Sequence, residues 1–105
     1  MKVKAFAIYD SKVESFMAPF FMRTRGEAMR GFIDACADEK TNFCKHPEDF
    51  TLFEIAEYDE TSGRFENLQA PVSVETGLGA KAYNQRSSGV PEHMDRVLQV
   101  EKGQH

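Results

Sequence analysis

The 105-residue chain has the size of one ordinary domain, and nine Phe residues supply most of the large apolar side chains for a single core. Its formal net charge of −4 is unevenly spread: residues 1–47 carry eight Lys/Arg and six Asp/Glu, whereas residues 48–75 carry eight Asp/Glu and one Arg. The acidic total argues against a protein that coats nucleic acid through bulk charge, although it leaves a local basic face open.

The first predicted elements are two strands. Residues 2–9 are rich in Val, Ile, Phe and Tyr and end at Asp10-Ser11, which is typical of a strand closed by a turn. Residues 15–22 are predicted to form a second strand. Pro19 within it cannot donate a ladder hydrogen bond, so this strand is expected at a sheet edge or at a bulge.

A helix is predicted from about residue 25 to 37. Thr24 and Glu27 have the spacing of a capping box. The opposite face places Arg23 near Glu27 and Arg30 near Asp34, at the spacing of helical ion pairs. The apolar side chains fall within one arc at about 100° per residue, and they are Ala28, Met29, Phe32, Ile33 and Cys36.

The rest of the chain predicts a β-hairpin followed by loops. Asp38 to Pro47 is expected to be a polar loop, residues 50–58 a strand, and residues 59–63 a hairpin turn with Gly63 in a late position. The return strand starts at Arg64, and Pro71 is expected to limit its length, either ending it or leaving only a short extension at residues 72–74. From residue 76 on, the many Gly and Ser residues indicate loop structure.

The element order β-β-α-β-β predicts an α+β fold in which one helix packs on one face of an antiparallel sheet. Residues 1–75 would form this single domain. Residues 76–105 would be a loop-rich, less ordered C-terminal extension, in which residues 91–99 form either a short helix or part of a disordered tail.

No residue pattern indicates catalysis, a metal site or a cofactor, so we expect a non-enzymatic protein. The histidines lie in predicted loops or the tail, and the serines lack a hydrolase elbow. The spacing of Cys36, Cys44 and His46 is poor for zinc, and Cys36 on the apolar arc is better explained as a buried thiol. The acidic residues of the hairpin, Glu54, Glu57, Asp59 and Glu60, are expected to be a solvated surface.

The thiols and the N-terminal residues predict where the protein is found. Cys36 and Cys44 form no Cys-x-x-Cys pattern, and the first residues lack the apolar run of a secretory signal. No stretch of about 18 apolar residues is present. We therefore expect a reducing cytoplasm, free thiols and no membrane partner.

Five segments carry a common resemblance, and they are Tyr9–Lys12, Pro19–Gly26, Ala28–Phe32, Phe43–Glu54 and Tyr58–Gly63. Together they resemble the small non-structural, DNA-binding-type protein of gokushovirus-like microviruses, which are phages with single-stranded DNA genomes. The resemblance spans roughly residues 1–75 and is most specific in Lys45-His-Pro-Glu-Asp49 and Thr51-Leu-Phe-Glu54. It implies an early protein of the host bacterial cytoplasm, absent from the virion, that acts in single-stranded DNA synthesis or packaging. It brings no catalytic residues.

Two functional hypotheses follow. The first is a phage auxiliary protein that binds single-stranded DNA weakly or contacts viral replication proteins, with cations on phosphates and aromatic rings on bases. Residues 46–48 (His46, Pro47 and Glu48) are either a recognition loop or a structural turn ended by the proline. The predicted DNA contacts are Lys2, Lys4, Lys12, Arg23, Arg25 and Lys45, with Tyr9 and Phe21 for stacking.

The alternative is a protein-interaction module without direct DNA binding, either a homodimer or a binder of a host factor. Its surface would be the Phe-rich strand around Pro19 or the acidic hairpin at residues 54–60. The distribution of surface charge in the folded chain separates the two hypotheses. A continuous basic groove free of carboxylates would favour DNA, whereas interleaved charges with an apolar patch would favour a protein partner.

Overall fold

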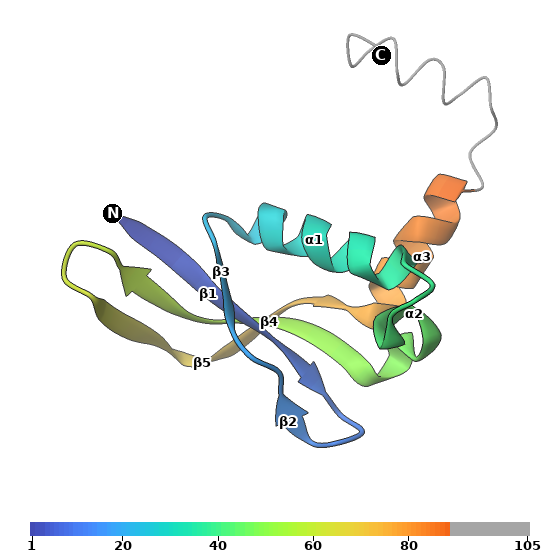
Figure 1. The fold of residues 1–105 in the computed structure, drawn as a ribbon, viewed down its shortest axis with the longest axis horizontal. Coiled ribbons are helices and arrows are strands. Elements are labelled where there is room, and N and C mark those ends of the chain that lie inside the picture. Colours follow the sequence, from blue (N-terminus) through green and yellow to red (C-terminus); the bar gives the residue numbers. More distant parts are fainter. Residues whose placement is uncertain (89–105) are drawn as a thin grey trace, which may run out of the picture.

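The computed structural model describes residues 1–88, and Figure 1 shows their arrangement. The helix or tail expected at residues 91–99 lies outside the described residues. The elements are β1 (Lys2–Asp10), β2 (Ser15–Phe16), β3 (Phe20–Met22), α1 (Arg25–Ala37), α2 (Asn42–Lys45), a 3-10 turn η1 (Pro47–Asp49), β4 (Phe50–Asp59), β5 (Arg64–Thr76) and α3 (Gly77–Ser88). The fold is α+β with an antiparallel sheet, as predicted.

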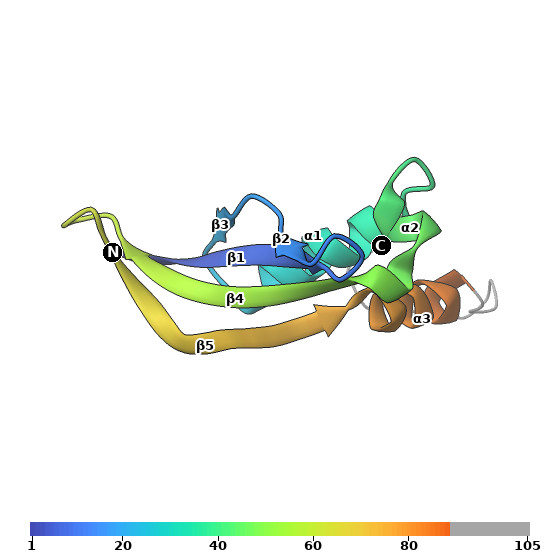
Figure 2. The same cartoon turned by 90° about the horizontal axis from the view of Figure 1, so that it is seen from below.

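The sheet has the strand order β2-β1-β4-β5, and β3 pairs with the same side of β1 as β2 does. All pairings are antiparallel. Figures 1 and 2 place α1 along one face of this sheet and α3 beyond the end at which β5 finishes. Among residues 1–88, no helix has the length and apolar character needed to cross a membrane.

The predicted second strand is correct in its edge position but wrong in its continuity. Residues 15–22 form two short strands, β2 and β3, which are separated by Met17, Ala18 and Pro19. Pro19 has no N–H to offer to β1, so the ladder is interrupted there. The break lets both strands pair with one edge of β1.

Helix α1 has the predicted bounds, and its capping is confirmed. The Glu27 N–H donates to Thr24 Oγ1 at 3.1 Å, and Glu27 Oε1 accepts from the Arg23 N–H at 3.0 Å. The predicted apolar arc faces the sheet, where Phe32 is 3% exposed. Burying that face stabilises the helix more than its propensity does, because isolated helices of this length are marginal in water.

The hydrophobic core lies between α1 and one sheet face. Phe6, Ile8, Phe50 and Leu52 contribute from β1 and β4. Ala80 of α3, which has no exposed surface, belongs to the same cluster. Partly buried side chains from three further elements pack against this cluster: Phe20 and Met22 of β3, Phe43 of α2 and Val74 of β5.

The loop expected from residue 76 is wrong up to Ser88, because residues 77–88 form α3. Thr76 Oγ1 accepts from the Gly79 N–H at 2.9 Å and caps its start, while Asn84 Nδ2 donates to the Ile33 carbonyl at 3.0 Å. Gly77 lies so close to Pro47 that a Cβ there would overlap the Pro47 carbonyl oxygen. The helix propensity of residues 77–88 is weak, so contacts with α1 and η1 stabilise α3 and the sequence alone does not reveal it.

The expected polar loop between Asp38 and Pro47 contains the short helix α2, which Thr41 caps by accepting from the Cys44 N–H at 3.2 Å. The return strand β5 continues past Pro71 as far as Thr76, so the extension at residues 72–74 is present and Pro71 does not end the strand. Residues 68–71 bulge opposite a single β4 residue, since Asn67 pairs with Ala56 and Val72 pairs with Glu54. β5 is an edge strand, where a proline is tolerated.

Candidate functional site

The sheet has one covered face and one open face. Residues directly opposite in an antiparallel pair point to the same side, so the strand register assigns each side chain to a face. α1 packs on the side of Phe6 and Ile8. We call the other side the open face; no strand residue assigned to it is charged. It comprises Val3, Ala5, Ala7, Tyr9, Phe16, Phe21, Thr51, Phe53, Ala56, Tyr58, Phe65, Asn67, Ser73 and Thr76.

Six aromatic rings on the open face form two triads. The first triad is Tyr9, Phe16 and Phe53, with ring centroids 4.9 to 6.5 Å apart. The second triad is Phe21, Tyr58 and Phe65, with centroids 4.9 to 6.1 Å apart. Corresponding positions of the two are four β1 residues apart, or about 13 Å. The three phenylalanines at the strand edges are well exposed: Phe16 at 44%, Phe21 at 46% and Phe65 at 58%.

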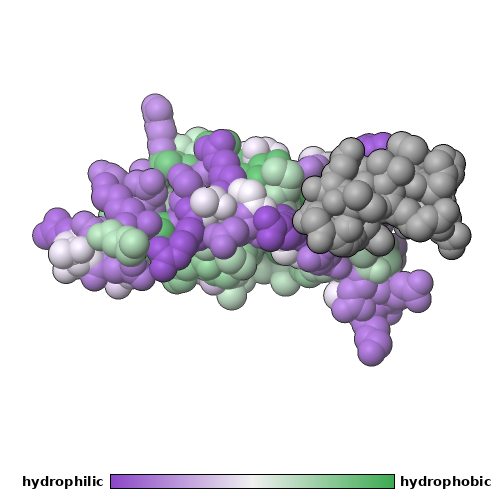
Figure 3. Space-filling view, turned by 90° about the horizontal axis from the view of Figure 1, so that it is seen from above, coloured by the Kyte–Doolittle hydropathy of each residue, from purple (hydrophilic) through white to green (hydrophobic). Residues whose placement is uncertain are grey.

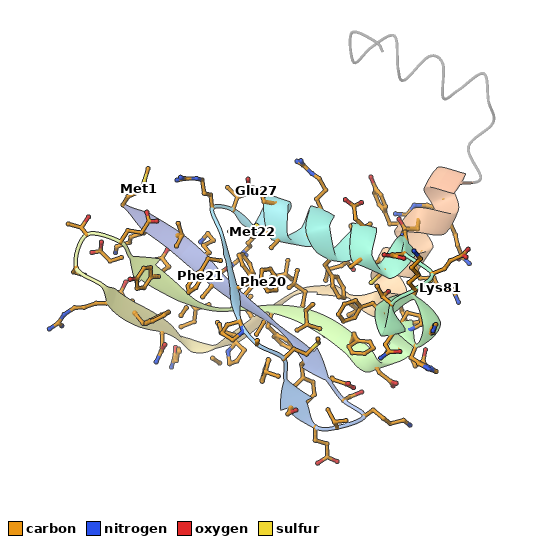
Figure 4. The ribbon with its side chains drawn as sticks, viewed as in Figure 1. Met1, Phe20, Phe21, Met22, Glu27 and Lys81 are labelled. Atoms are coloured by element: carbon orange, nitrogen blue, oxygen red, sulfur yellow. The ribbon has the colours of Figure 1, made fainter. Side chains whose placement is uncertain are left out.

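Neighbouring residues of β3 point in opposite directions, so only one of its phenylalanines reaches the open face. Phe20 packs against Phe6 on the helix side, with centroids 6.0 Å apart. Phe21 leaves the strand on the other side (Figure 4). In the view of Figure 3, hydrophobic residues are interspersed among hydrophilic ones at the surface.

A groove of about 530 Å³ lies at the second triad. Val3 and Met22 complete its apolar lining, while Arg23 and Glu60 add one positive and one negative group. The Glu60 N–H donates to the Met1 carbonyl at 2.9 Å, which fixes the hairpin turn beside the start of β1. Five of its seven lining residues lie on strands β1, β3, β4 and β5.

Three of the six predicted phosphate-binding cations are held in ion pairs. Lys2 Nζ lies 3.5 Å from Glu66 Oε1. Lys4 Nζ lies 3.2 Å from Glu54 Oε2 and 3.8 Å from Glu57 Oε2. Arg25 Nε donates to Glu54 Oε1. Carboxylates of β4 and β5 therefore neutralise half of the cations that were predicted to bind phosphates.

Glu54 is the centre of this network. It is 2% exposed in the middle of β4. Burial pushes its pKa up, but the hydrogen bonds from Arg25 and Lys4 outweigh that effect and hold the pKa below its ordinary value. Glu54 is therefore a structural carboxylate that ties the start of α1 to β1 and β4. It is also a residue that the sequence placed on a solvated surface, which the structure corrects.

The other three cations lie apart from one another. Within residues 1–88, no ion pair includes Lys12, Arg23 or Lys45. Lys12 is exposed in the turn after β1, Arg23 lies between β3 and α1, and Lys45 ends α2. The ion pairs expected along α1 are also absent from the described residues, because Glu27 accepts a backbone N–H instead. The predicted cations do not line a single basic track.

Residues 3–80 match the family model described as Phage ORF5 protein. The chain belongs to this phage protein family. No curated protein and no solved structure matches the chain.

The predicted recognition loop has a buried centre and exposed flanks. Pro47 is buried and begins η1, whereas His46 and Glu48 are exposed. The ligand atoms of His46, Glu48 and Asp49 lie within 4.8 Å of one another. Gly77 of α3 approaches the Pro47 backbone, so this proline positions α3 against the end of the sheet.

Both cysteines of this phage protein lie near α3, and no disulfide joins them. Cys36 is buried; burial, together with the nearby Cys44 and Glu75, raises the pKa of its thiol to about 11. The groove between α1, α2 and α3 includes both cysteines and Lys81, and Lys81 is labelled in Figure 4. A thiol with a raised pKa is a poor nucleophile at neutral pH, which agrees with its interpretation as a structural residue.

Sequence reasoning found two members of the aromatic triads, Tyr9 and Phe21, but missed Phe16, Phe53, Tyr58 and Phe65 as surface residues. The available signal was the alternation along β4, which places Phe53 on the side opposite Leu52 but would place Tyr58 on the same side as Leu52. The extra residue Ile55 moves Tyr58 to the open face. A bulge of one residue exchanges the two faces. It is not visible in the spacing of the residues.

Proposed function

We propose that this chain is a non-enzymatic phage auxiliary protein of the gokushovirus type that binds single-stranded DNA weakly on its open sheet face, during viral single-stranded DNA synthesis and packaging. The observation that carries the proposal is the pair of exposed aromatic triads on a face without charged strand residues. Unstacked bases offer flat apolar surfaces, and aromatic side chains stack on them with little regard to sequence.

The charges support a stacking mode over a phosphate-tracking one. Lys2, Lys4 and Arg25 are occupied by carboxylates, while Lys12 is exposed in the turn between β1 and β2, the strands that carry Tyr9 and Phe16 of the first triad. About one phosphate contact gives a slope of log K against log salt of roughly −0.7 for a single strand. A duplex keeps its bases stacked inside, so it has no flat base surface to offer, and binding should favour single strands.

The test is fluorescence anisotropy with a labelled thymidine oligonucleotide about 12 nucleotides long at low salt. Phe16→Ala and Phe65→Ala each remove an exposed ring and should weaken binding about five-fold or more, since stacking on one base is worth about 1–3 kcal/mol. Leu78→Ala, at an α3 residue that is 55% exposed, is the matched control and should bind like the unaltered chain. Absence of binding at low salt, or equal affinity of all three variants, contradicts the proposal.

A protein-interaction module is the second candidate, and the mostly apolar groove at Phe21, Tyr58 and Phe65 favours it. The partner would be a second copy of the chain, a replication protein or a host factor. Sedimentation velocity over a range of concentrations distinguishes the first of these. A dimer that Phe65→Ala converts to a monomer, with no affinity for the oligonucleotide, would replace DNA binding by self-association.

A further inference from the structure

The groove at the second triad carries two opposite charges that do not meet. Phe21, Tyr58 and Phe65 supply aromatic walls, and Arg23 and Glu60 line the same groove. Within residues 1–88, neither Arg23 nor Glu60 takes part in an ion pair. The Arg23 guanidinium donates instead to Met1 Sδ, with Nη1 3.6 Å from the sulfur, a weak bond that a better acceptor replaces at little cost.

This lining specifies the hydrogen-bonding edge of a flat ligand. A guanidinium only donates and a carboxylate only accepts, so a ring stacked on the aromatic lining must offer acceptors to Arg23 and donors to Glu60. A carboxylate accepts best from two N–H groups side by side. Among the DNA bases, guanine alone places two such donors, N1–H and N2–H, next to each other on one edge. Its O6 and N7 are acceptors of the kind that arginine binds.

We propose that this groove is a guanine-binding subsite of the single-strand surface, in which Glu60 accepts from the guanine N1–H and N2–H and Arg23 donates to its acceptor atoms. The inference rests on the proposed function and adds base preference to it. A phosphate group does not fit the same lining, because the Glu60 carboxylate repels it. The first triad consists of three aromatic rings, Tyr9, Phe16 and Phe53, so we expect it to stack on any base.

The experiment compares two thymidine oligonucleotides that carry guanine or hypoxanthine at the same isolated positions. Hypoxanthine lacks the N2 amino group and keeps N1–H, O6 and N7. The unaltered chain should bind the guanine strand about five-fold more tightly, the lower end of what a bidentate base contact gives. Glu60→Ala should make the two affinities equal while leaving binding of an all-thymidine strand unchanged. Glu39→Ala, at another exposed carboxylate, should keep the preference.

Each outcome decides one claim. Binding of both strands with equal affinity by the unaltered chain overturns the guanine subsite and leaves single-strand binding intact. Binding of no strand overturns the proposed function together with this inference. A dimer whose dissociation requires Phe65→Ala identifies a second copy as the occupant of the groove, which also overturns the subsite.

Discussion

The close approach of α3 to η1 predicts that Gly77→Ala destabilises the fold. A Cβ at Gly77 would overlap the Pro47 carbonyl oxygen and lie 2.8 Å from the carbonyl carbon. The atoms that a Cβ would meet are backbone atoms of Pro47, so no side-chain rotation relieves the overlap. Overpacking costs about 1–3 kcal/mol, and rigid surroundings favour the upper end. The better helix propensity of Ala returns at most about 1 kcal/mol, which leaves a net loss of about 2 kcal/mol.

Thermal and urea unfolding, followed by circular dichroism, measure this loss. A net loss of about 2 kcal/mol lowers the melting temperature by about 10 °C in a domain of this size. Gly31→Ala is the control: Gly31 is exposed within α1, and a Cβ there meets nothing within 4 Å. It should stabilise the chain by about 0.5–1 kcal/mol. A Gly77→Ala variant that melts at or above the temperature of the unaltered chain refutes the packing of α3 on Pro47.

The other predictions concern the two titratable groups in the interior. Glu54→Gln should lower stability at neutral pH by about 2 kcal/mol, less than for a fully buried pair because Lys4 and Arg25 are partly exposed. The pKa of Glu54 is lower in the folded chain than its ordinary value of 4.5, so the ionised carboxylate stabilises the fold above pH 4.5 and this stabilisation is lost as the pH falls through the folded pKa. In urea unfolding, the difference in stability between the unaltered chain and Glu54→Gln should therefore shrink as the pH falls below 4.5. Cys44, which is partly exposed, should react with a maleimide at pH 8 well before buried Cys36. The reason is that only about one Cys36 thiol in a thousand is ionised at that pH. Equal labelling rates of the two thiols, measured by mass spectrometry, would contradict the burial of Cys36.

Local signals predicted the elements whose stability is local. The bounds of α1 follow from the capping pair Thr24 and Glu27 and from an unbroken apolar arc. β4 follows from its run of β-branched and aromatic residues between a proline turn and Gly63. In both segments propensity, pattern and termination agree, which is the condition under which a sequence specifies its own structure.

The elements that the sequence concealed depend on partners distant in the chain. α3 begins with two glycines in three residues. Ala80 is its buried apolar side chain, while the larger Leu78 and Tyr83 stay exposed. Its support comes from Pro47 and from the Asn84 bond to Ile33, and no periodicity within residues 77–88 announces those contacts. The length of β5 depends likewise on a bulge that places Pro71 where the sheet needs no N–H.

The uneven charge of the chain has a structural explanation that bears on the proposed DNA binding. The antiparallel register sets Lys2 opposite Asp59 and Lys4 opposite Glu57, so basic β1 and the acidic hairpin neutralise each other within one sheet. Arg25 adds a third cation through Glu54, which it shares with Lys4. Three of the six cations that suggested a phosphate track are therefore structural, and the proposed single-strand binding draws most of its affinity from the aromatic rings. A single-strand complex of this protein should accordingly weaken little with salt and strongly with the loss of Phe16 or Phe65, which is the opposite of the pattern expected for a basic groove.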